Sequence, residues 1–200
     1  MFPDLSRRRH NLPAQASSFI GRQQALGEIG RRLRLHRLVT LTGAGGAGKT
    51  RLALQAVAAE LDRFADGVWL VELAPLASSE LVVETIAKVL AMPEASDPSP
   101  LDGLSAFLRA KQLLLVLDNC EHLIAACAHI AAHLLARCPD MALLATSHEA
   151  LDIAPGNGSC ASLPSASPIR RSRQMRSKCS TTTGFACLSS GRTLPSPRFG

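Results

Sequence analysis

A glycine-rich segment constrains the fold of this chain more than any other feature. Residues 43–50 read GAGGAGKT and fit the pattern G-x-x-x-x-G-K-[ST]. The stretch 37–42 before them is apolar and β-branched, as in a buried strand, whereas residues 51–64 after them carry apolar side chains at helical spacing. A strand, a glycine loop and a helix in this order are the context in which the pattern marks a phosphate-binding loop. The sequence therefore predicts a binding site for a nucleoside triphosphate.

Each residue type in this loop has a chemical role. Glycine adopts the positive-φ conformations that let backbone N–H groups converge on an anion, and a helix N-terminus adds free donors and partial positive charge. We predict that Lys49 contacts the β- and γ-phosphates and that the Thr50 hydroxyl binds Mg²⁺. The alternative is a glycine-rich turn with a merely exposed lysine, and both flanking segments argue against it. The nucleotide-binding residues predicted here are Gly43, Ala44, Gly45, Gly46, Ala47, Gly48, Lys49, Thr50 and Arg51.

Apolar and amphipathic segments alternate along the first 150 residues. This alternation is typical of an α/β fold, here a three-layer P-loop NTPase fold with an open parallel sheet and helices on both faces. Strands are predicted over 37–42, 68–73, 113–118 and 141–146, and helices over 23–35, 51–64, 79–90, 101–110 and 121–137. After Ala154 the apolar residues recur with neither the strand period of 2 nor the helical period of 3.6, so we predict no helix or strand there. The predicted parts are a disordered basic leader (1–10), an incomplete P-loop NTPase domain (11–154) and a disordered low-complexity tail (155–200).

The positive charge belongs to the tail. The whole chain carries +6, yet residues 153–200 hold seven basic and no acidic side chains, so the rest is close to neutral. Aromatic side chains are not interleaved with the basic residues of the tail as they are in a base-reading surface, and we predict no direct DNA binding by this chain. No apolar run is long enough to span a membrane, and the arginines near the N-terminus precede no apolar export segment. The six cysteines form no C-x-x-C pair, so we predict free thiols and a cytoplasmic protein.

A carboxylate ends the third predicted strand. Asp118 follows five apolar residues and could order Mg²⁺ directly or through water, although a lone Asp at this place usually only solvates the strand end. Asn119 could position the attacking water, and Glu121 could accept its proton. The alternative for Glu121 is a first-turn acid that complements its own helix dipole. The candidate catalytic residues are Lys49, Asp118, Asn119 and Glu121, and the candidate Mg²⁺ ligands are Thr50 and Asp118.

Polar residues also end the fourth predicted strand. Thr146, Ser147 and His148 stand where side chains can reach a γ-phosphate, and we name them candidate sensor residues. The alternative is a capping serine followed by a surface histidine.

Several blocks of the sequence together resemble the bacterial NB-ARC/STAND type of signal-transduction ATPase. The blocks are residues 11–13 (NLP), 19–22 (FIGR), 41–52 (LTGAGGAGKTRL), 66–73 (DGVWLVEL), 115–123 (LVLDNCEHL) and 144–147 (LATS). The resemblance covers about Asn11 to Leu151. It implies the ATPase module of a large transcriptional regulator, whose intact relatives add winged-helix or LuxR-type DNA-binding domains and sensor domains and can oligomerise. It also implies that Phe19, Ile20, Gly21 and Arg22 lie near adenine and ribose.

This family acts as a slow nucleotide switch, in which ADP holds the protein closed and ATP opens it for assembly. The resemblance therefore implies ATP, ADP and Mg²⁺ as ligands, and a sheet order of 5-1-4-3-2. Two departures stand out. The family commonly has Arg after the Thr-Ser of the fourth strand, whereas this chain has His148, a weaker and pH-dependent substitute. The fifth strand, lid and winged helix that follow in the family are not visible beyond Leu151.

We expect from this that the module is truncated and that a frameshift near codon 155 supplied the tail, which sequencing of the locus tests. Without a fifth strand, residues 37–42 would form an exposed sheet edge. The alternative is that the tail around residues 159–163 pairs there by default, although nothing in its pattern favours this. Three functions stay open: an ATP/ADP-dependent switch, a non-catalytic nucleotide-binding or scaffolding remnant, and a stand-alone small-molecule kinase or AAA+-like motor. The missing lid and acceptor site count against the third.

Overall fold

A single parallel sheet organises the computed structural model, which describes residues 10–14, 22–93, 99–151, 153 and 160–164. Its strands are β1 (Leu38–Thr42), β2 (Gly67–Glu72), β3 (Leu113–Asp118), β4 (Ala142–Ser147) and β5 (Cys160–Pro164). The α-helices are α1 (Gln23–Leu35), α2 (Lys49–Ala58), α3 (Leu81–Val89), α4 (Pro100–Leu108) and α5 (Ile124–Arg137), with short 3₁₀ helices η2 (Leu61–Arg63) and η3 (Cys120–Leu123). Outside the described residues lie most of the predicted leader and tail, and Phe19, Ile20 and Gly21.

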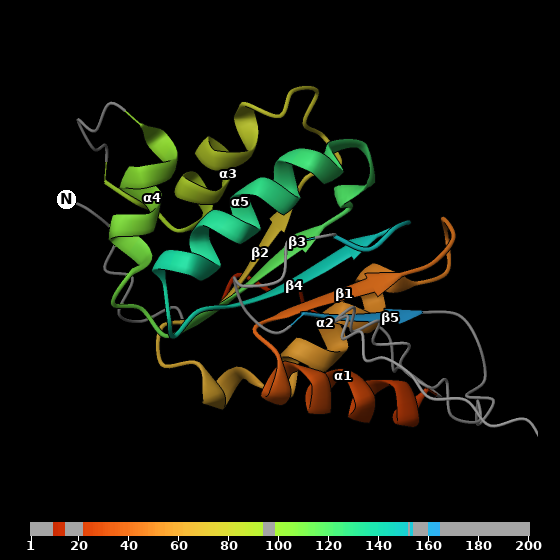
Figure 1. The fold of residues 1–200 in the computed structure, drawn as a ribbon. Helices are drawn as coiled ribbons and strands as arrows, with labels where there is room; N and C mark the ends of the chain where they lie inside the picture. Colours follow the sequence, from red (N-terminus) through yellow and green to blue (C-terminus); the bar gives the residue numbers. More distant parts are fainter. Residues whose placement is uncertain (1–9, 15–21, 94–98, 152, 154–159, 165–200) are drawn as a thin grey trace, which may run out of the picture. The chain divides into compact units, whose positions relative to one another are not determined.

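The strand order is β2-β3-β4-β1-β5, and each strand is parallel to its neighbours (Figure 1). This is the order 5-1-4-3-2 that the resemblance implies, so that expectation is confirmed. Because all strands run the same way, their carboxyl ends share one edge of the sheet. The predicted site residues after β1, β3 and β4 therefore meet at that edge.

The sequence predicts no fifth strand, and this prediction is wrong. β5 pairs with β1 from Leu38↔Cys160 to Thr42↔Pro164, so β1 lies inside the sheet rather than at its edge. Ala161 is buried, and the Thr42 hydroxyl donates a hydrogen bond to the Leu163 carbonyl oxygen at 3.2 Å. No strand was predicted because this short, partly polar segment has no strand pattern of its own. The default pairing of residues 159–163 with the edge of β1 was the alternative, and the observed β5 agrees with it, because an edge strand presents unpaired backbone groups.

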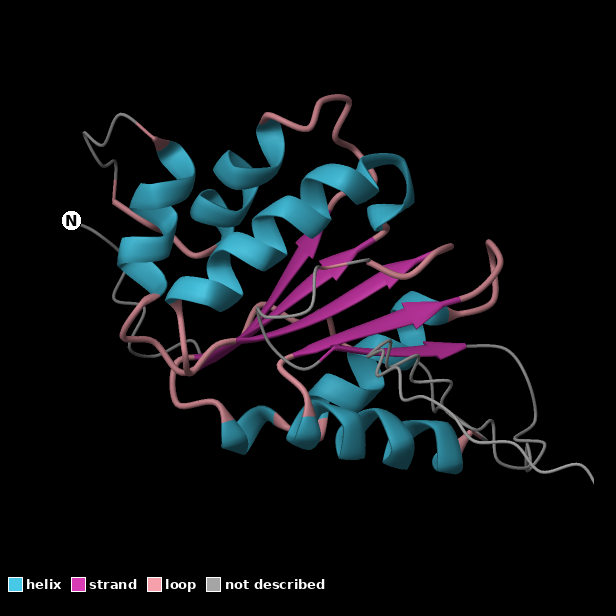
Figure 2. Cartoon of the chain, viewed as in Figure 1, coloured by secondary structure: helices cyan, strands magenta, loops and turns pink. Residues whose placement is uncertain are grey.

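Helices lie on both sides of the sheet (Figure 2), and alternate residues of each strand face opposite sides. One face packs against α1 and α2 and contributes Val39, Leu41, Val68, Leu70, Leu114, Val116, Ala142 and Leu144 to one apolar cluster. The other face packs against α3, α4 and α5 and contributes Leu38, Trp69, Val71, Leu113, Leu115, Leu117, Leu143 and Ala145 to a second cluster. Both faces are covered by helices, which explains the near-continuous apolar runs in the strands.

The outer edge of β2 is covered by the segment before α1. His10 forms a parallel bridge with Val68. The amide side chain of Asn11 binds the backbone of Leu70 twice, donating to its carbonyl oxygen at 2.8 Å and accepting from its N–H at 2.6 Å. Asn11 thus satisfies backbone groups that an edge strand would otherwise expose.

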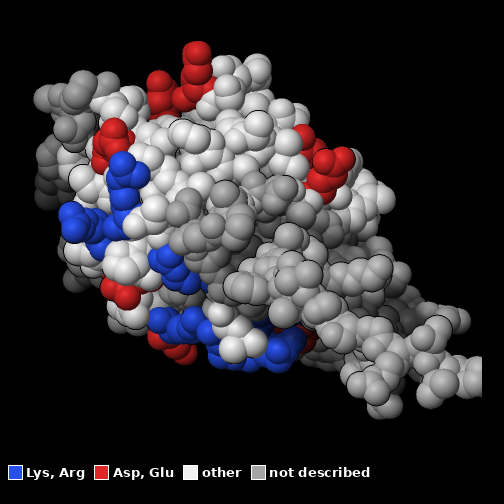
Figure 3. Space-filling view, viewed as in Figure 1, with Lys and Arg blue, Asp and Glu red and all other residues white. Residues whose placement is uncertain are grey.

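Basic side chains gather along the lower edge of the face drawn in Figure 3, over α1. This helix contains Arg31, Arg32 and Arg34. The first two bind Glu28, and Arg34 binds Glu60, so their charges are paired locally. Among the described residues, no helix has the length and apolarity needed to cross a membrane.

Candidate nucleotide-binding site

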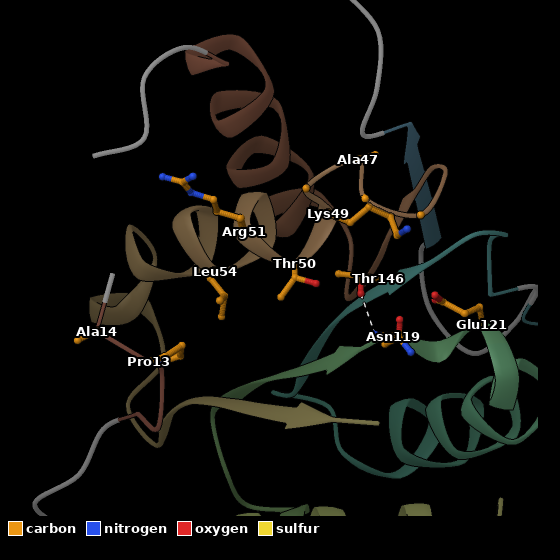
Figure 4. Close-up of a pocket in the computed structure, with 13 residues that line it drawn as sticks. Pro13, Ala14, Ala47, Lys49, Thr50, Arg51, Leu54, Asn119, Glu121 and Thr146 are labelled. Carbon is orange, nitrogen blue, oxygen red and sulfur yellow. Dashed lines mark hydrogen bonds between the residues drawn. The ribbon is translucent and has the colours of Figure 1, made fainter. Parts of the chain in front are cut away.

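A pocket of about 500 Å³ opens at the carboxyl end of the sheet (Figure 4). It brings together residues from the glycine loop, α2, the segment before α1, and the ends of β3 and β4. Its walls are Pro13, Ala14, Gly45, Gly46, Ala47, Gly48, Lys49, Thr50, Arg51, Leu54, Asn119, Glu121 and Thr146.

The glycine loop leads directly from β1 into α2. Gly46 and Gly48 have φ angles of 72° and 78°, a region in which the backbone of residues other than glycine is strained. Gly48 is the N-cap residue of α2, so the first N–H groups of this helix lie at the pocket. These groups have no partner within the helix and suit an anion such as phosphate.

Lys49 is buried although it is charged, with only 8% of its surface exposed. Its Nζ donates hydrogen bonds to the carbonyl oxygens of Gly43 at 2.8 Å and Ala44 at 3.1 Å. Gly43 and Ala44 therefore contact the lysine rather than line the pocket.

A hydrogen-bond chain joins α2, β3 and β4 at the base of the pocket. The hydroxyls of Thr50 and Thr146 both donate to Oδ1 of Asp118, at 2.7 and 2.6 Å. The Asn119 N–H in turn donates to the Thr146 hydroxyl at 2.9 Å. A carboxylate beside a threonine hydroxyl is a set of hard oxygen donors, and this chemistry fits Mg²⁺.

Asn119 and Glu121 follow β3 and line the same pocket. Asn119 has a φ angle of 68°, a left-handed conformation that asparagine tolerates better than most residues. Glu121 lies in the first turn of η3, as the dipole alternative expects. Its Oε1 is also 3.4 Å from Nε2 of His148.

The remaining predicted residues lie around the pocket. Ser147 is fully buried, and its hydroxyl accepts a hydrogen bond from the Glu149 N–H at 3.4 Å. Arg22, the described member of the predicted base-binding segment, donates from Nη1 to the Ala47 carbonyl oxygen at 3.1 Å. This contact ties the start of α1 to the glycine loop.

Three wall residues were not predicted as site residues: Pro13, Ala14 and Leu54. Leu54 carries only a helical-spacing signal, which indicates a core position equally well. Pro13 belongs to the NLP block of the family resemblance, and this block was the one available signal that the segment matters to the site.

Cys120, which follows Asn119 at the site, is unsuited to nucleophilic chemistry. Cys120, Cys127 and Cys138 are buried free thiols, as predicted. The contact with Cys127, together with burial, raises the pKa of Cys120, so that this thiol stays protonated.

Comparisons with known proteins find relatives of this chain. The family model of novel STAND NTPase 1 matches residues 9–150. A Mycobacterium tuberculosis protein named as an HTH-type transcriptional regulator is 45% identical over 119 residues, which cover 60% of this chain and 13% of that protein. An uncharacterized protein of the same species is 39% identical over 154 residues, or 77% of this chain and 39% of that protein. The chain thus spans less than half the length of these relatives.

Solved structures share the fold. A STAND protein with a tetratricopeptide repeat sensor from Pyrococcus horikoshii matches with a TM-score of 0.54 and 13% identity, covering 76% of this chain and 24% of that chain. The ORC2 protein of Aeropyrum pernix, solved as ADPNP–ADP complexes, matches with a TM-score of 0.52 and 15% identity, covering 74% of this chain and 48% of that chain. The three-layer P-loop NTPase fold predicted from the sequence is confirmed.

Proposed function

The chain belongs to the novel STAND NTPase 1 family, and on this premise we propose that it is an ATP- and ADP-binding ATPase module that acts as a slow nucleotide switch. The observation that carries the proposal is the pocket at the glycine loop. There Lys49, the N-terminus of α2 and the Thr50–Asp118 contact converge within one site.

In this proposal the glycine loop and Lys49 bind the phosphates. Their positive charge and free N–H groups match the charge of a triphosphate. Arg51 in the first turn of α2, Leu54 about one turn further along the helix, and Pro13 from the segment before α1 extend the wall of the site beyond the loop. Phe19 to Arg22 contact the adenine and ribose, as the family resemblance implies.

Thr50 and Asp118 would hold Mg²⁺, which neutralises phosphate charge when it is bound. Glu121 accepts the proton of the attacking water, and Asn119 orients that water. Thr146, Ser147 and His148 at the end of β4 sense the γ-phosphate. These roles are supported by the shared pocket wall of Asn119, Glu121 and Thr146.

The larger context follows from the relatives. One relative is named as a transcriptional regulator, and this chain corresponds to a small part of its length. We infer that the module serves a cytoplasmic regulator in which other domains bind DNA and sense the signal, and that nucleotide state controls its assembly.

Thermal unfolding and turnover of the purified chain test the proposal. ATP or ADP with Mg²⁺, at about 100 times its Kd, would raise the Tm by roughly 5–10 °C. Mg²⁺-dependent ATP turnover should be measurable, and Lys49→Ala should abolish both effects. Lys88→Ala is the matched control, because the Lys88 side chain on α3 is 78% exposed and far from the pocket in the fold. No shift in Tm with either nucleotide would overturn the proposal.

A second candidate is a nucleotide-binding remnant that does not hydrolyse ATP. It is favoured by the contact of Glu121 with His148, because that contact occupies the carboxylate proposed here as the base. If nucleotide raises the Tm but no ATP turnover is measured at any pH tested, the result would support the remnant over the switch.

A further inference from the structure

Glu121 lines the pocket, and its two carboxylate oxygens have different surroundings. Figure 4 shows Lys49 and Glu121 extending toward the same pocket from α2 and from η3. Oε1 of Glu121 lies 3.4 Å from Nε2 of His148. Oε2 is buried, and no group among the described residues donates a hydrogen bond to it. A buried carboxylate oxygen without a donor is costly, so the carboxylate depends on a stabilising partner at its other oxygen, Oε1.

His148 is placed to be that partner. It follows directly on β4, the strand between β3 and β1, and so stands between η3 and the glycine loop. A Cβ atom on Gly45 would lie 3.7 Å from its Nε2, which puts the imidazole against the loop as well. The His148 side chain is 49% exposed, so solvent can supply and remove its proton.

We propose that His148 is a positioning residue that withholds Glu121 while its imidazole is protonated and releases it when the proton leaves to solvent. This rests on the proposed function, which makes Glu121 the acceptor of a proton from water. A positively charged imidazolium attracts the carboxylate, whereas a neutral imidazole has no net charge and does not attract it in this way. Because the proposed attraction requires a charged imidazole, pH is the variable that tests it.

Other charged groups near this pair have partners elsewhere. Lys49 binds two loop carbonyl oxygens, and Asp118 accepts two threonine hydroxyls. His122, in the same 3₁₀ helix as Glu121, lies 3.1 Å through Nε2 from the Leu76 carbonyl oxygen. Glu149 is exposed and follows His148 in the chain. His122 is therefore the matched control for a histidine effect at this site.

The pH profile of ATP hydrolysis tests the proposal. An exposed ion pair shifts a population by up to about fivefold, so kcat of the wild type should rise two- to fivefold between about pH 5.5 and pH 8.5. The ratio of kcat at the two pH values should fall to about one in His148→Gln and in His148→Arg, with the arginine variant slow at both. His122→Gln should keep the wild-type ratio, and KM should change less than kcat. A His148→Gln variant that keeps the full rise overturns the proposal.

A second measurement needs no nucleotide and so separates this proposal from the proposed function. The Tm losses of His148→Gln, Glu121→Gln and the double variant form a cycle. At about pH 5.5 the Tm of the double variant should fall by less than the sum of the falls in the two single variants. At about pH 8.5 the fall in the double variant should equal that sum. Additive losses at both pH values overturn the pairing even if ATP is hydrolysed. Coupling at acidic pH supports it even if no turnover is found.

Discussion

The hydroxyl of Thr50 donates a hydrogen bond of 2.7 Å to Oδ1 of Asp118, although 68 positions separate the two residues in the chain. Thr50 lies in the first turn of α2, and Asp118 is the last residue of β3. The contact therefore spans β1 and β4 and fixes the glycine-loop helix to the opposite side of the pocket. The metal-binding pair proposed for this module is held together by the fold itself.

Replacing Thr50 with Val removes the hydroxyl and keeps the size of the side chain. In the wild type, Mg²⁺ should increase the ATP affinity by some factor. In Thr50→Val we expect this factor to be at least about tenfold smaller, because hydrogen bonds to charged groups contribute about 1.5–3 kcal/mol. Calorimetric titrations with Mg²⁺ and with EDTA measure the difference. Thr85→Val is the control, since the Thr85 hydroxyl binds only the Leu81 carbonyl oxygen within α3. An unchanged Mg²⁺ effect in Thr50→Val would exclude this ligand role.

Thr146 holds the base of the pocket through two hydrogen bonds and is 1% exposed. In Thr146→Val the Asn119 N–H loses its acceptor, and Asp118 loses one of two donors. Leaving a buried group unpaired costs about 1–3 kcal/mol, and we expect a loss of unfolding free energy in this range. Urea unfolding measures it. Thr146→Ser keeps the hydroxyl and should lose less than half as much; equal losses in both variants would point to the methyl group instead.

Asn11 covers the edge of β2 with a pair of hydrogen bonds to Leu70. Asn11→Ala should lower the unfolding free energy by about 1–3 kcal/mol, because each neutral hydrogen bond contributes about 0.5–1.5 kcal/mol. An uncovered edge also favours association, so light scattering should show more aggregation on heating. Gln24→Ala, at an exposed position of α1, is the control and should change neither quantity. Wild-type stability in Asn11→Ala would show that the edge needs no cover.

The hydrogen bond from Arg31 holds the pKa of Glu28 at about 2, below the ordinary value of 4.5. Because the folded-state pKa is the lower one, the stabilisation is present above pH 4.5 and disappears as the pH falls toward about 2. Glu28 stays partly exposed, so we expect Glu28→Gln to cost only about 1 kcal/mol at neutral pH. Urea unfolding at neutral pH and near pH 2 should give a difference that vanishes at the acidic value. Glu84→Gln is the control, since its pair with Lys88 is 3.8 Å long and exposed.

The sequence predicted best those elements whose pattern is local. The strand over Leu113–Asp118 and the helix over Gln23–Leu35 have the predicted bounds, because uninterrupted apolar residues and regular helical spacing mark each one without help from the rest of the chain. The same holds for the glycine loop, whose chemistry lies within eight consecutive residues.

The features that could not be predicted depend on contacts between residues that are far apart in the sequence. β5 forms because β1 presents unpaired backbone groups, and this is not visible in residues 160–164 themselves. Pro13 reaches the pocket because Asn11, two residues earlier, is anchored on β2. The contact of Glu121 with His148 arises from the adjacency of β3 and β4, and the sequence around each residue did not indicate the other as its partner.

The position of Lys49 changes what a dissociation constant of this module would mean. Its ammonium group already binds the carbonyl oxygens of Gly43 and Ala44, so the loop acts as an internal competitor for the lysine. A phosphate oxygen must displace these carbonyls, and the lysine contributes to affinity only the difference between the two sets of contacts. Changes that weaken the carbonyl contacts would tighten nucleotide binding without adding any contact to the nucleotide.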